Sequence, residues 1–310
     1  MDFVGVGECL IDFTPSGTGG MGNPAFEMNP GGGVVNCVAA YTALGGSGAA
    51  ICAVGRDLFG NFLIDKLKAS HIDVSAVQVI DDVHTTLAVV SLQPNGERKF
   101  AFLRDPGADT QIDEAKIDFS LIEHCKALHF SSLSLCYGPA LSATMACVRY
   151  AKAHGKLISF DPNFRPPLWQ DTAKAIDAIK GGLRFADVVK LSEEEMELTL
   201  NVPRETPAKG AQRLMDMGVN TCYITYGAKG AYYADVTARG FVDGFTVKAV
   251  DTTGCGDAFS GAAMYFMLNH PAFDIAARTK LANACGAICA TRMGAMMAMP
   301  TFDELMAFAG

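Results

Sequence analysis

With 310 residues, of which 50% are hydrophobic and 19% charged, the chain can bury a substantial core as one large domain, alone or with a small appendage. The formal net charge of −8 argues against a nucleic-acid-binding protein, because neutralising phosphates requires a basic face. The sequence contains no run of about eighteen apolar residues, and residues 1–3 carry no basic side chain, so we expect neither a membrane span nor a signal peptide. The 10 cysteines are scattered without a Cys-x-x-Cys pair, which favours a reduced, cytoplasmic protein.

The chain opens with a strand pattern over residues 3–13. Gly5 and Gly7 begin a glycine pattern used by dinucleotide-binding folds, but Leu10 occupies the place of the third glycine, so that fingerprint fails. Asp12 follows near the end of the pattern. From the residues alone it is an ordinary acid at the end of a strand.

Residues 14–30 are rich in glycine and contain few apolar side chains, which predicts a loop or a pair of short edge strands. Three consecutive glycines, Gly31, Gly32 and Gly33, then lead to a predicted helix at residues 37–44. Because glycine has no Cβ, such a run suggests that the backbone closely approaches a ligand.

A buried strand is predicted at residues 49–54 and a helix at residues 61–69. Residues 85–92 and 99–104 then flank an Asn-Gly pair at positions 95–96, which is typical of a hairpin turn. A hairpin interrupts an alternation of strands and helices. We therefore expect it in a small β-sheet lid rather than in the main sheet.

From residue 120 onward strands and helices alternate, which predicts a parallel sheet with helices on both faces. The segments are residues 127–130, 139–154, 156–160, 172–184 and 188–191. Arg165 lies shortly after the second of these strands, at the edge where open α/β sheets bind ligands. Its position makes Arg165 a candidate ligand-binding residue.

Two further polar segments follow strands. Residues 190–195, Lys-Leu-Ser-Glu-Glu-Glu, contain an ordinary capping box and an acidic first helical turn. Residues 225–230 read alone as a glycine-rich β-turn, and no Walker A sequence occurs, so this is not a P-loop. Residues 279–291 predict an apolar helix.

The most informative segment is residues 251–261, Asp-Thr-Thr-Gly-Cys-Gly-Asp-Ala-Phe-Ser-Gly. It lies between a predicted strand at residues 245–250 and a predicted helix at residues 258–269, so Gly254 and Gly256 fall at a helix start. There the unpaired N–H groups and the helix dipole favour an anion, and the glycines let it come close.

Asp257 has two interpretations that the spacing leaves open. A carboxylate in the first helical turn is usually a capping or dipole residue. Beside an anion site, however, it would repel a phosphate unless it had a task. Accepting a proton from a hydroxyl that attacks phosphorus is the task that fits.

Residues 251–257 resemble the C-terminal signature of the ribokinase-like (PfkB-type) carbohydrate kinases, and other matches run from residue 5 to about residue 295. The Gly-Glu opening and the segments around residues 104 and 161–169 are most similar to fructokinase-type members. The resemblance implies that Asp257 is the catalytic base. It also implies that Gly254, Cys255 and Gly256 form the anion hole.

The same resemblance assigns ligands to other positions. Val34 and Val35 stand where Ala and Pro are usual, and Ser192 replaces an asparagine as expected of fructokinase-like members. The implied sugar-binding residues are Asp12, Gly31, Gly32, Gly33, Asn36, Arg104 and Arg165. The implied nucleotide-binding residues are Lys190, Thr225, Gly227, Gly230 and Asn283. Glu195 would organise Mg²⁺ through water, and Asp251 and Thr253, with the backbone near Gly294, would hold a monovalent cation such as K⁺.

The fold expected is a Rossmann-like three-layer α/β sandwich with a mostly parallel central sheet. It forms a single domain over residues 1–310, with a β-sheet lid from about residues 13–30 and 84–107. The function implied is ATP-dependent phosphorylation of fructose to fructose 6-phosphate by in-line transfer. The alternatives are 2-keto-3-deoxygluconate, ribose or an aminoimidazole riboside as acceptor, and, in another class, a non-catalytic sugar-sensing protein. A homodimer through the lid is a further expectation.

Overall fold

The computed structural model describes residues 1–92 and 98–310. It contains a ten-stranded sheet in the order β14-β13-β12-β11-β10-β9-β1-β4-β5, with β6 paired to β4. Every pair from β12 to β5 is parallel, whereas β13 and β14 are antiparallel additions at one edge. The strands are β1 (Phe3–Val6), β4 (Gly48–Gly55), β5 (Ile72–Asp73), β6 (Val77–Ile80), β9 (Ala127–Ser131), β10 (Leu157–Asp161), β11 (Val188–Ser192), β12 (Thr221–Thr225), β13 (Gly230–Asp235) and β14 (Arg239–Asp243).

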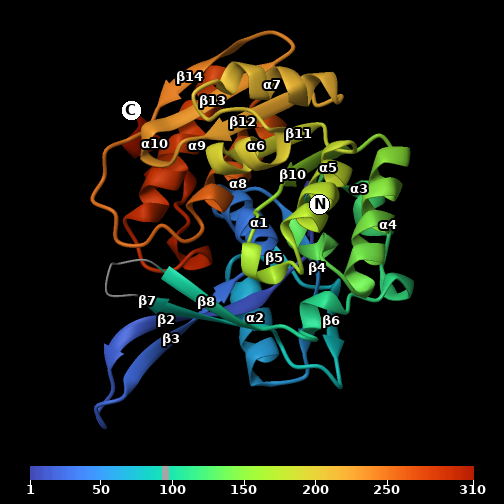
Figure 1. The fold of residues 1–310 in the computed structure, drawn as a ribbon, viewed down its shortest axis with the longest axis vertical. Helices are drawn as coiled ribbons and strands as arrows, with labels where there is room; N and C mark the ends of the chain where they lie inside the picture. The colour runs from blue at the N-terminus through green and yellow to red at the C-terminus, as the bar shows by residue number, and fades with distance from the viewer. Residues whose placement is uncertain (93–97) are drawn as a thin grey trace.

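Helices cover both faces of this sheet, as Figure 1 shows, so the predicted three-layer sandwich is confirmed. Alternate residues of one strand enter different layers: Phe3 packs in one buried apolar cluster and Val4 in the other. The cluster that includes Phe3 contains side chains of α1 (Gly33–Ala43), α2 (Leu58–Ala69), α8 (Cys255–Asn269), α9 (Ile275–Ala290) and α10 (Phe302–Ala309). The other contains side chains of α3 (Ser120–His124), α4 (Pro139–Ala153), α5 (Thr172–Leu183), α6 (Glu193–Leu200) and α7 (Pro207–Asp216).

A second sheet of four strands, in the order β3-β2-β7-β8, extends away from the sandwich (Figure 1). Its strands are β2 (Leu10–Thr18), β3 (Pro24–Gly31), β7 (Leu87–Leu92) and β8 (Arg98–Leu103). The glycine-rich residues 14–30 thus form most of an antiparallel hairpin. The expected strands around residues 85–104 pair antiparallel, and their Asn-Gly turn lies outside the described residues. That the sheet acts as a lid stays a prediction.

The strand predicted at residues 245–250 is wrong. This segment is irregular, because the hairpin of β13 and β14 ends at Asp243 and leaves it no neighbouring strand. Val250 instead donates its backbone N–H to the carbonyl of Ala290, at the end of α9, over 2.7 Å. The large residues of the segment follow a strand-like pattern because several of them line a cavity, described below.

The parallel strands bring distant segments to one edge. Since β1, β9, β10, β11 and β12 run in the same direction, the residues that follow their carboxyl ends meet there. No helix among residues 1–92 and 98–310 is long and apolar enough to cross a bilayer.

Candidate active site

Helix α8 begins in the glycine segment. Gly254 caps it with a φ of 78°, a conformation that favours glycine, and a Cβ there would lie 2.5 Å from the Cβ of Ala295. A Cβ on Gly256 would lie 2.8 Å from Nζ of Lys190. The first turn of a helix has backbone N–H groups without intrahelical partners. Here those groups and an ammonium face the same space, which suits an anion.

Asp257 lies in the first turn of α8 and is 8% exposed. Nδ2 of Asn36 donates to its Oδ2 over 2.9 Å, and Nδ2 of Asn163 donates to its Oδ1 over 3.2 Å. Burial, and then the negative charge of Asp161, raise the pKa of Asp257 to about 6, against the opposing effects of Asn36 and nearby cations. The carboxylate is therefore ionised at neutral pH but is a stronger base than an exposed aspartate.

Lys190 and Asp161 form a nearly buried ion pair, with 3.0 Å between Nζ and Oδ2. Asp161 ends β10 and Lys190 lies on the adjacent strand β11. The negative groups around Lys190 raise its pKa, although burial opposes this. Neither Asp161 nor Asn163 was singled out from the sequence, although both lie in the segment that contributed Arg165. An acid and an amide directly after a parallel strand were the available signal.

The three consecutive glycines each face a polar group of the site. A Cβ on Gly31 would lie 2.2 Å from Oδ2 of Asp12, and one on Gly33 would lie 1.8 Å from Nδ2 of Asn163. Gly32 has a φ of 118°, and a Cβ there would lie 2.5 Å from the backbone oxygen of Glu8. At Gly31 and Gly33 the backbone closely approaches side chains of the site, and the inferred approach to a ligand stays a prediction.

Asp12, Asn36 and Arg165 are brought together around Asp257. Burial raises the pKa of Asp12 to about 7, the charge of Arg165 partly offsets this, and Asp257 adds to it. Asn36 is 3% exposed, and its Oδ1 has no hydrogen-bond partner among the described residues. This cluster offers carboxylate and amide acceptors and one guanidinium to a polar ligand.

Arg104 has a different environment. Its side chain is buried, its Nε donates to Oδ2 of Asp109 over 2.8 Å, and its Nη2 donates to the carbonyl of Leu133 over 2.9 Å. The ion pair with Asp109 neutralises its charge. The remaining nitrogen, Nη1, is buried without a partner in the described part of the chain. These contacts tie the end of β8 to the segment after β9, and sugar binding by Arg104 stays a prediction.

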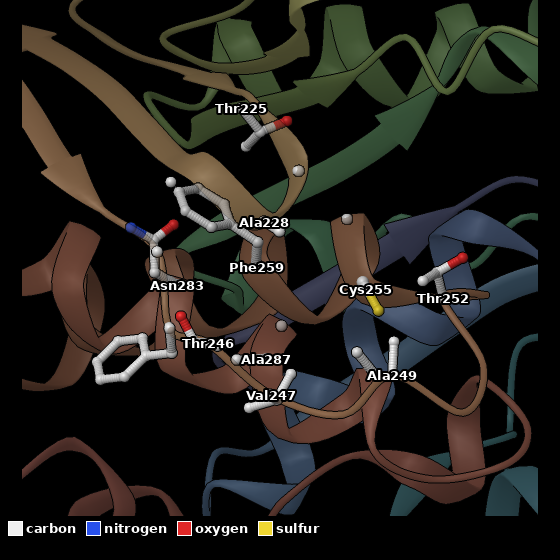
Figure 2. A pocket seen from close by; sticks show the side chains of 17 residues that line it. Thr225, Ala228, Thr246, Val247, Ala249, Thr252, Cys255, Phe259, Asn283 and Ala287 are labelled. Carbon is white, nitrogen blue, oxygen red and sulfur yellow. The ribbon is translucent and has the colours of Figure 1, made fainter.

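An apolar cavity of about 410 Å³ lies on one side of the start of α8 (Figure 2). Figure 2 shows Thr225 and Asn283 on one side and Cys255 and Thr252 on the other. Gly227 and Gly230 also line it, so the predicted nucleotide residues other than Lys190 meet here. Nδ2 of Asn283 donates to the carbonyl of Val242 over 3.1 Å. Part of the lining comes from the irregular residues 244–249.

A more polar cleft of about 760 Å³ lies on the other side and is lined by Asp257, Lys190, Arg165 and Glu195, among others. Gly256 and Thr252 line both spaces, so the cavity and the cleft meet at the start of α8. An apolar cavity that opens onto cationic side chains suits a ligand with a flat apolar ring and an anionic tail.

Glu195 makes the capping box expected of α6. Ser192 donates its backbone N–H to Oε2 over 2.8 Å, and Glu195 donates its own to Oγ of Ser192 over 3.2 Å. Oε1 accepts the backbone N–H of Phe164 over 2.8 Å, so α6 is fixed to the segment after β10. Carboxylate oxygens in a phosphate-sized cleft also fit a hydrated Mg²⁺. The metal role of Glu195 stays a prediction beside this structural one.

Asp251 and Thr253 lie together beside the glycine segment. Oδ1 of Asp251 accepts the backbone N–H and the hydroxyl of Thr253 over 2.9 and 2.7 Å, and Oδ2 accepts the N–H of Gly294 over 3.2 Å. The described residues contain no group of three His, Cys, Asp or Glu side chains that could hold a metal ion. A cation at Asp251 would therefore need carbonyl, hydroxyl or water ligands as well.

Comparisons with known proteins agree on one family. Residues 2–301 match the pfkB family carbohydrate kinase. Probable fructokinase-5 of Arabidopsis thaliana is 38% identical over 305 residues, which cover 96% of this chain and 94% of that protein.

Two solved structures illustrate the likeness of the fold. A fructokinase double mutant from Vibrio cholerae O395, bound to fructose, ADP and potassium ion, is 32% identical with a TM-score of 0.89, covering 100% of this chain and 99% of that one. A putative ribokinase II from E. coli in complex with ATP and Mg²⁺ is 29% identical with a TM-score of 0.89, covering 99% and 98%.

Proposed function

Because the chain belongs to the pfkB family of carbohydrate kinases, we propose that it transfers the γ-phosphoryl group of ATP to a hydroxymethyl group of fructose. The product would be fructose 6-phosphate. The observation that carries the proposal is the position of Asp257, a buried carboxylate held by Asn36 and Asn163 where the polar cleft meets the start of α8. The fructokinase names of the relatives support fructose as the acceptor.

Each part of the site has a task in this reaction. Asp257 accepts the proton of the attacking hydroxyl, since its raised pKa suits a general base near neutral pH. The backbone of Gly254, Cys255 and Gly256, together with Lys190, stabilises the negative charge on the transferred phosphoryl group. Adenine occupies the apolar cavity beside Asn283.

The sugar binds between the two sheets. Asp12 and the unpartnered Oδ1 of Asn36 accept hydrogen bonds from its hydroxyl groups. Gly31, Gly32 and Gly33 keep this space clear of side chains, and Arg165 contacts a sugar or phosphate oxygen. These contacts place one hydroxymethyl group beside Asp257.

Metal ions complete the proposed site. Glu195 would hold Mg²⁺ through water, and the bound ion would neutralise charge on the phosphate oxygens. Asp251 and Thr253 contribute to a K⁺ site, for which the potassium-bound fructokinase is the supporting precedent. Activity would then require Mg²⁺ and increase with K⁺.

A second acceptor has one observation in its favour. Arg165 lines the polar cleft and its charge acts on Asp12, so a cation is available to a substrate carboxylate such as that of 2-keto-3-deoxygluconate. Ribose and an aminoimidazole riboside are further alternatives from the sequence. A non-catalytic sugar sensor is disfavoured, because the base and the glycine segment are both intact.

The deciding experiment is ADP release by the purified protein with ATP and Mg²⁺, measured across fructose, ribose, 2-keto-3-deoxygluconate, aminoimidazole riboside and no sugar. We expect the highest kcat/KM with fructose. Higher kcat/KM with the keto acid would change the substrate, and no sugar-dependent ADP release with any acceptor would overturn the kinase proposal.

The wider organisation is also proposed. We place the protein in the cytoplasm, where cysteines stay reduced; its ten cysteines all lie within the described residues, and none of them forms a disulfide bond. The whole of residues 1–310 forms one domain whose second sheet, around residues 13–30 and 84–107, closes over the sugar. A homodimer through that sheet would cover Phe26 and Leu103, which are 43% and 49% exposed. Size-exclusion chromatography with light scattering distinguishes this dimer from a monomer.

A further inference from the structure

Asp161 is a buried acid to which the reaction above gives no task. It is 2% exposed at the carboxyl end of β10. Its oxygens accept hydrogen bonds from three different segments: Nζ of Lys190 over 3.0 Å, Oγ of Ser260 over 3.1 Å, and the backbone N–H of Asn163 over 3.1 Å. A buried charge is retained only when it is paired and hydrogen-bonded, and two of the three partners here, Lys190 and Asn163, line the polar cleft.

The bond to Lys190 determines where the ammonium lies. Nζ is held so close to Gly256 that a Cβ on that residue would lie 2.8 Å from it. Two other acids, Asp257 and Glu195, also attract Lys190. If Asp161 lost its charge, the flexible lysine could pair with the base instead. Asp161 therefore holds the cation at the anion site and keeps it from neutralising Asp257.

The bond to Asn163 shapes the loop that contacts the base. Asn163 has a φ of 46°, an uncommon left-handed conformation, and its backbone N–H is bound to Oδ1 of Asp161. In this conformation its side chain donates to Oδ1 of Asp257 over 3.2 Å. The same loop continues to Phe164, which Glu195 holds from the other side.

We propose that Asp161 is a positioning residue of the phosphoryl transfer, which holds Lys190 against the glycine segment and Asn163 against the base. This inference rests on the proposed kinase function. It gives Asp161 two measurable effects, one on binding of the phosphate groups through Lys190 and one on the base.

The effect on the base is electrostatic. After burial, the charge of Asp161 is the largest cause of the raised pKa of Asp257. Replacing Asp161 by a neutral residue should therefore lower the pKa of Asp257, and the unpaired charge of Lys190 would add to that change. The other titratable groups that act on Asp257 or are acted on by it are Lys190, Arg165, Asp12, Cys37 and Cys289.

The test compares Asp161→Asn with Ser260→Ala in the full chain, by kcat against pH at saturating fructose and by KM for ATP. The pH dependence of kcat reports the base in the sugar-bound enzyme, whereas kcat/KM would also report Asp12, whose pKa is raised to about 7. Ser260→Ala removes the hydrogen bond that Oγ of Ser260 donates to Oδ2 of Asp161, the oxygen that also binds Lys190, but it leaves the charge of Asp161. We expect Asp161→Asn to move the acidic limb of kcat downward by about one pH unit. It should also lower kcat at neutral pH roughly tenfold to a hundredfold, as small misplacements of catalytic groups do. Ser260→Ala should keep the wild-type limb.

Two further measurements keep the inference decidable. Asp161→Glu keeps the negative charge but moves the carboxylate oxygens. It should therefore lower kcat and leave the acidic limb near its wild-type position. If Asp161→Asn does not fold, a wild-type kcat in the Asp161→Glu variant would overturn the proposal. If Asp161 acts on ATP binding through Lys190, the double variant with Asp161→Asn and Lys190→Met should have no higher KM for ATP than the single variant Lys190→Met. A folded Asp161→Asn variant with the wild-type acidic limb and the wild-type KM for ATP would overturn this inference but not the kinase function. A wild-type protein without kinase activity would overturn the kinase function.

Discussion

Burial gives two carboxylates of the site acid–base properties that they would not have in water. The pKa of Asp12 is raised to about 7 and that of Asp257 to about 6, in both cases chiefly because burial disfavours the charged form. The two acids also repel each other electrostatically. Proposed tasks explain why both are tolerated: one accepts hydrogen bonds from a sugar and the other accepts a proton.

Asp257→Asn should abolish turnover while fructose and ATP still bind, because an amide keeps the shape of the carboxylate but cannot accept the proton. We expect kcat to fall by at least ~10²–10⁴-fold, measured by ADP release, with binding followed by calorimetry. Asp303→Asn is a matched control, since Asp303 is an exposed acid in the first turn of α10. Near wild-type kcat in the Asp257 variant would leave that residue as a helix-capping acid.

Asp12→Ala should raise KM for fructose with little change in KM for ATP. A hydrogen bond to a charged group contributes ~1.5–3 kcal/mol, which corresponds to a KM increase of roughly ten- to a hundredfold. Steady-state kinetics with each substrate varied in turn measures both constants. An unchanged fructose KM in the folded variant would contradict the assignment, and equal weakening toward ATP would indicate damage to the fold.

The residues that the sequence did not single out share a physical cause. Asp257 and Asn36 occur in recognisable local patterns, and the structure brings their side chains within 2.9 Å. The task inferred for Asp161 depends instead on Lys190, which lies on the neighbouring strand, and on Ser260 in α8. No local pattern states which strands are neighbours. The charge network could therefore be found only after the sheet order was known.

At the scale of elements, the first turns of three helices lie at the site. Helix α1 begins at Gly33, α6 at Glu193 and α8 at Cys255, and all three first turns meet the loops after the parallel strands. The sequence predicted helices at residues 37–44 and 258–269, so α1 begins four residues and α8 three residues before the predicted start. The prediction failed at residues 245–250, where the alternation of large side chains is not matched by burial. None of these residues is fully buried, and Phe245, Thr246 and Val247 line the cavity in succession.

Glu195→Gln tests the start of α6. Both oxygens of Glu195 accept backbone N–H groups, and a glutamine would present its NH₂ group to one of those donors. We expect the unfolding free energy to fall by about 1–3 kcal/mol, the cost of one unsatisfied buried group. If Glu195 also orders the water shell of Mg²⁺, the Mg²⁺ concentration for half-maximal activity should rise more than KM for fructose.

Glu193→Gln is the control for this change, since Glu193 lies in the same first turn outside the capping box. Thermal unfolding separates the two tasks of Glu195. A lower Tm with a wild-type Mg²⁺ titration would make Glu195 a capping residue alone. A wild-type Tm would contradict the capping energy that the contacts imply.

At the scale of the whole molecule, the buried charges of the site lower the stability of the ligand-free protein. An acid whose pKa is raised on folding, as for Asp12, favours the folded state at low pH and loses that advantage as the pH rises toward its folded pKa. Buried His129 changes stability in the opposite sense, because its pKa is lowered to about 4 and its ionisation in the unfolded chain costs stability as the pH falls. A pH scan of the wild type alone therefore mixes opposing effects.

The substitution Asp12→Asn isolates the contribution of Asp12 to the pH dependence of stability. Asparagine stays neutral, so the variant should gain stability over the wild type as the pH rises from the unfolded pKa of Asp12 toward its folded value. The difference should be smaller at pH 5 than at pH 8, where wild-type Asp12 is ionised in its buried position. Because each kcal/mol shifts the Tm of a chain of this size by about 2–4 °C, differential scanning fluorimetry should resolve the growing difference. Saturating fructose should reverse the order, since only the wild type gains the stabilisation that comes with tight sugar binding. A Tm difference that does not change between pH 5 and pH 8 would show that Asp12 is solvated in the folded protein, and the buried carboxylate would then no longer explain how this site holds its sugar.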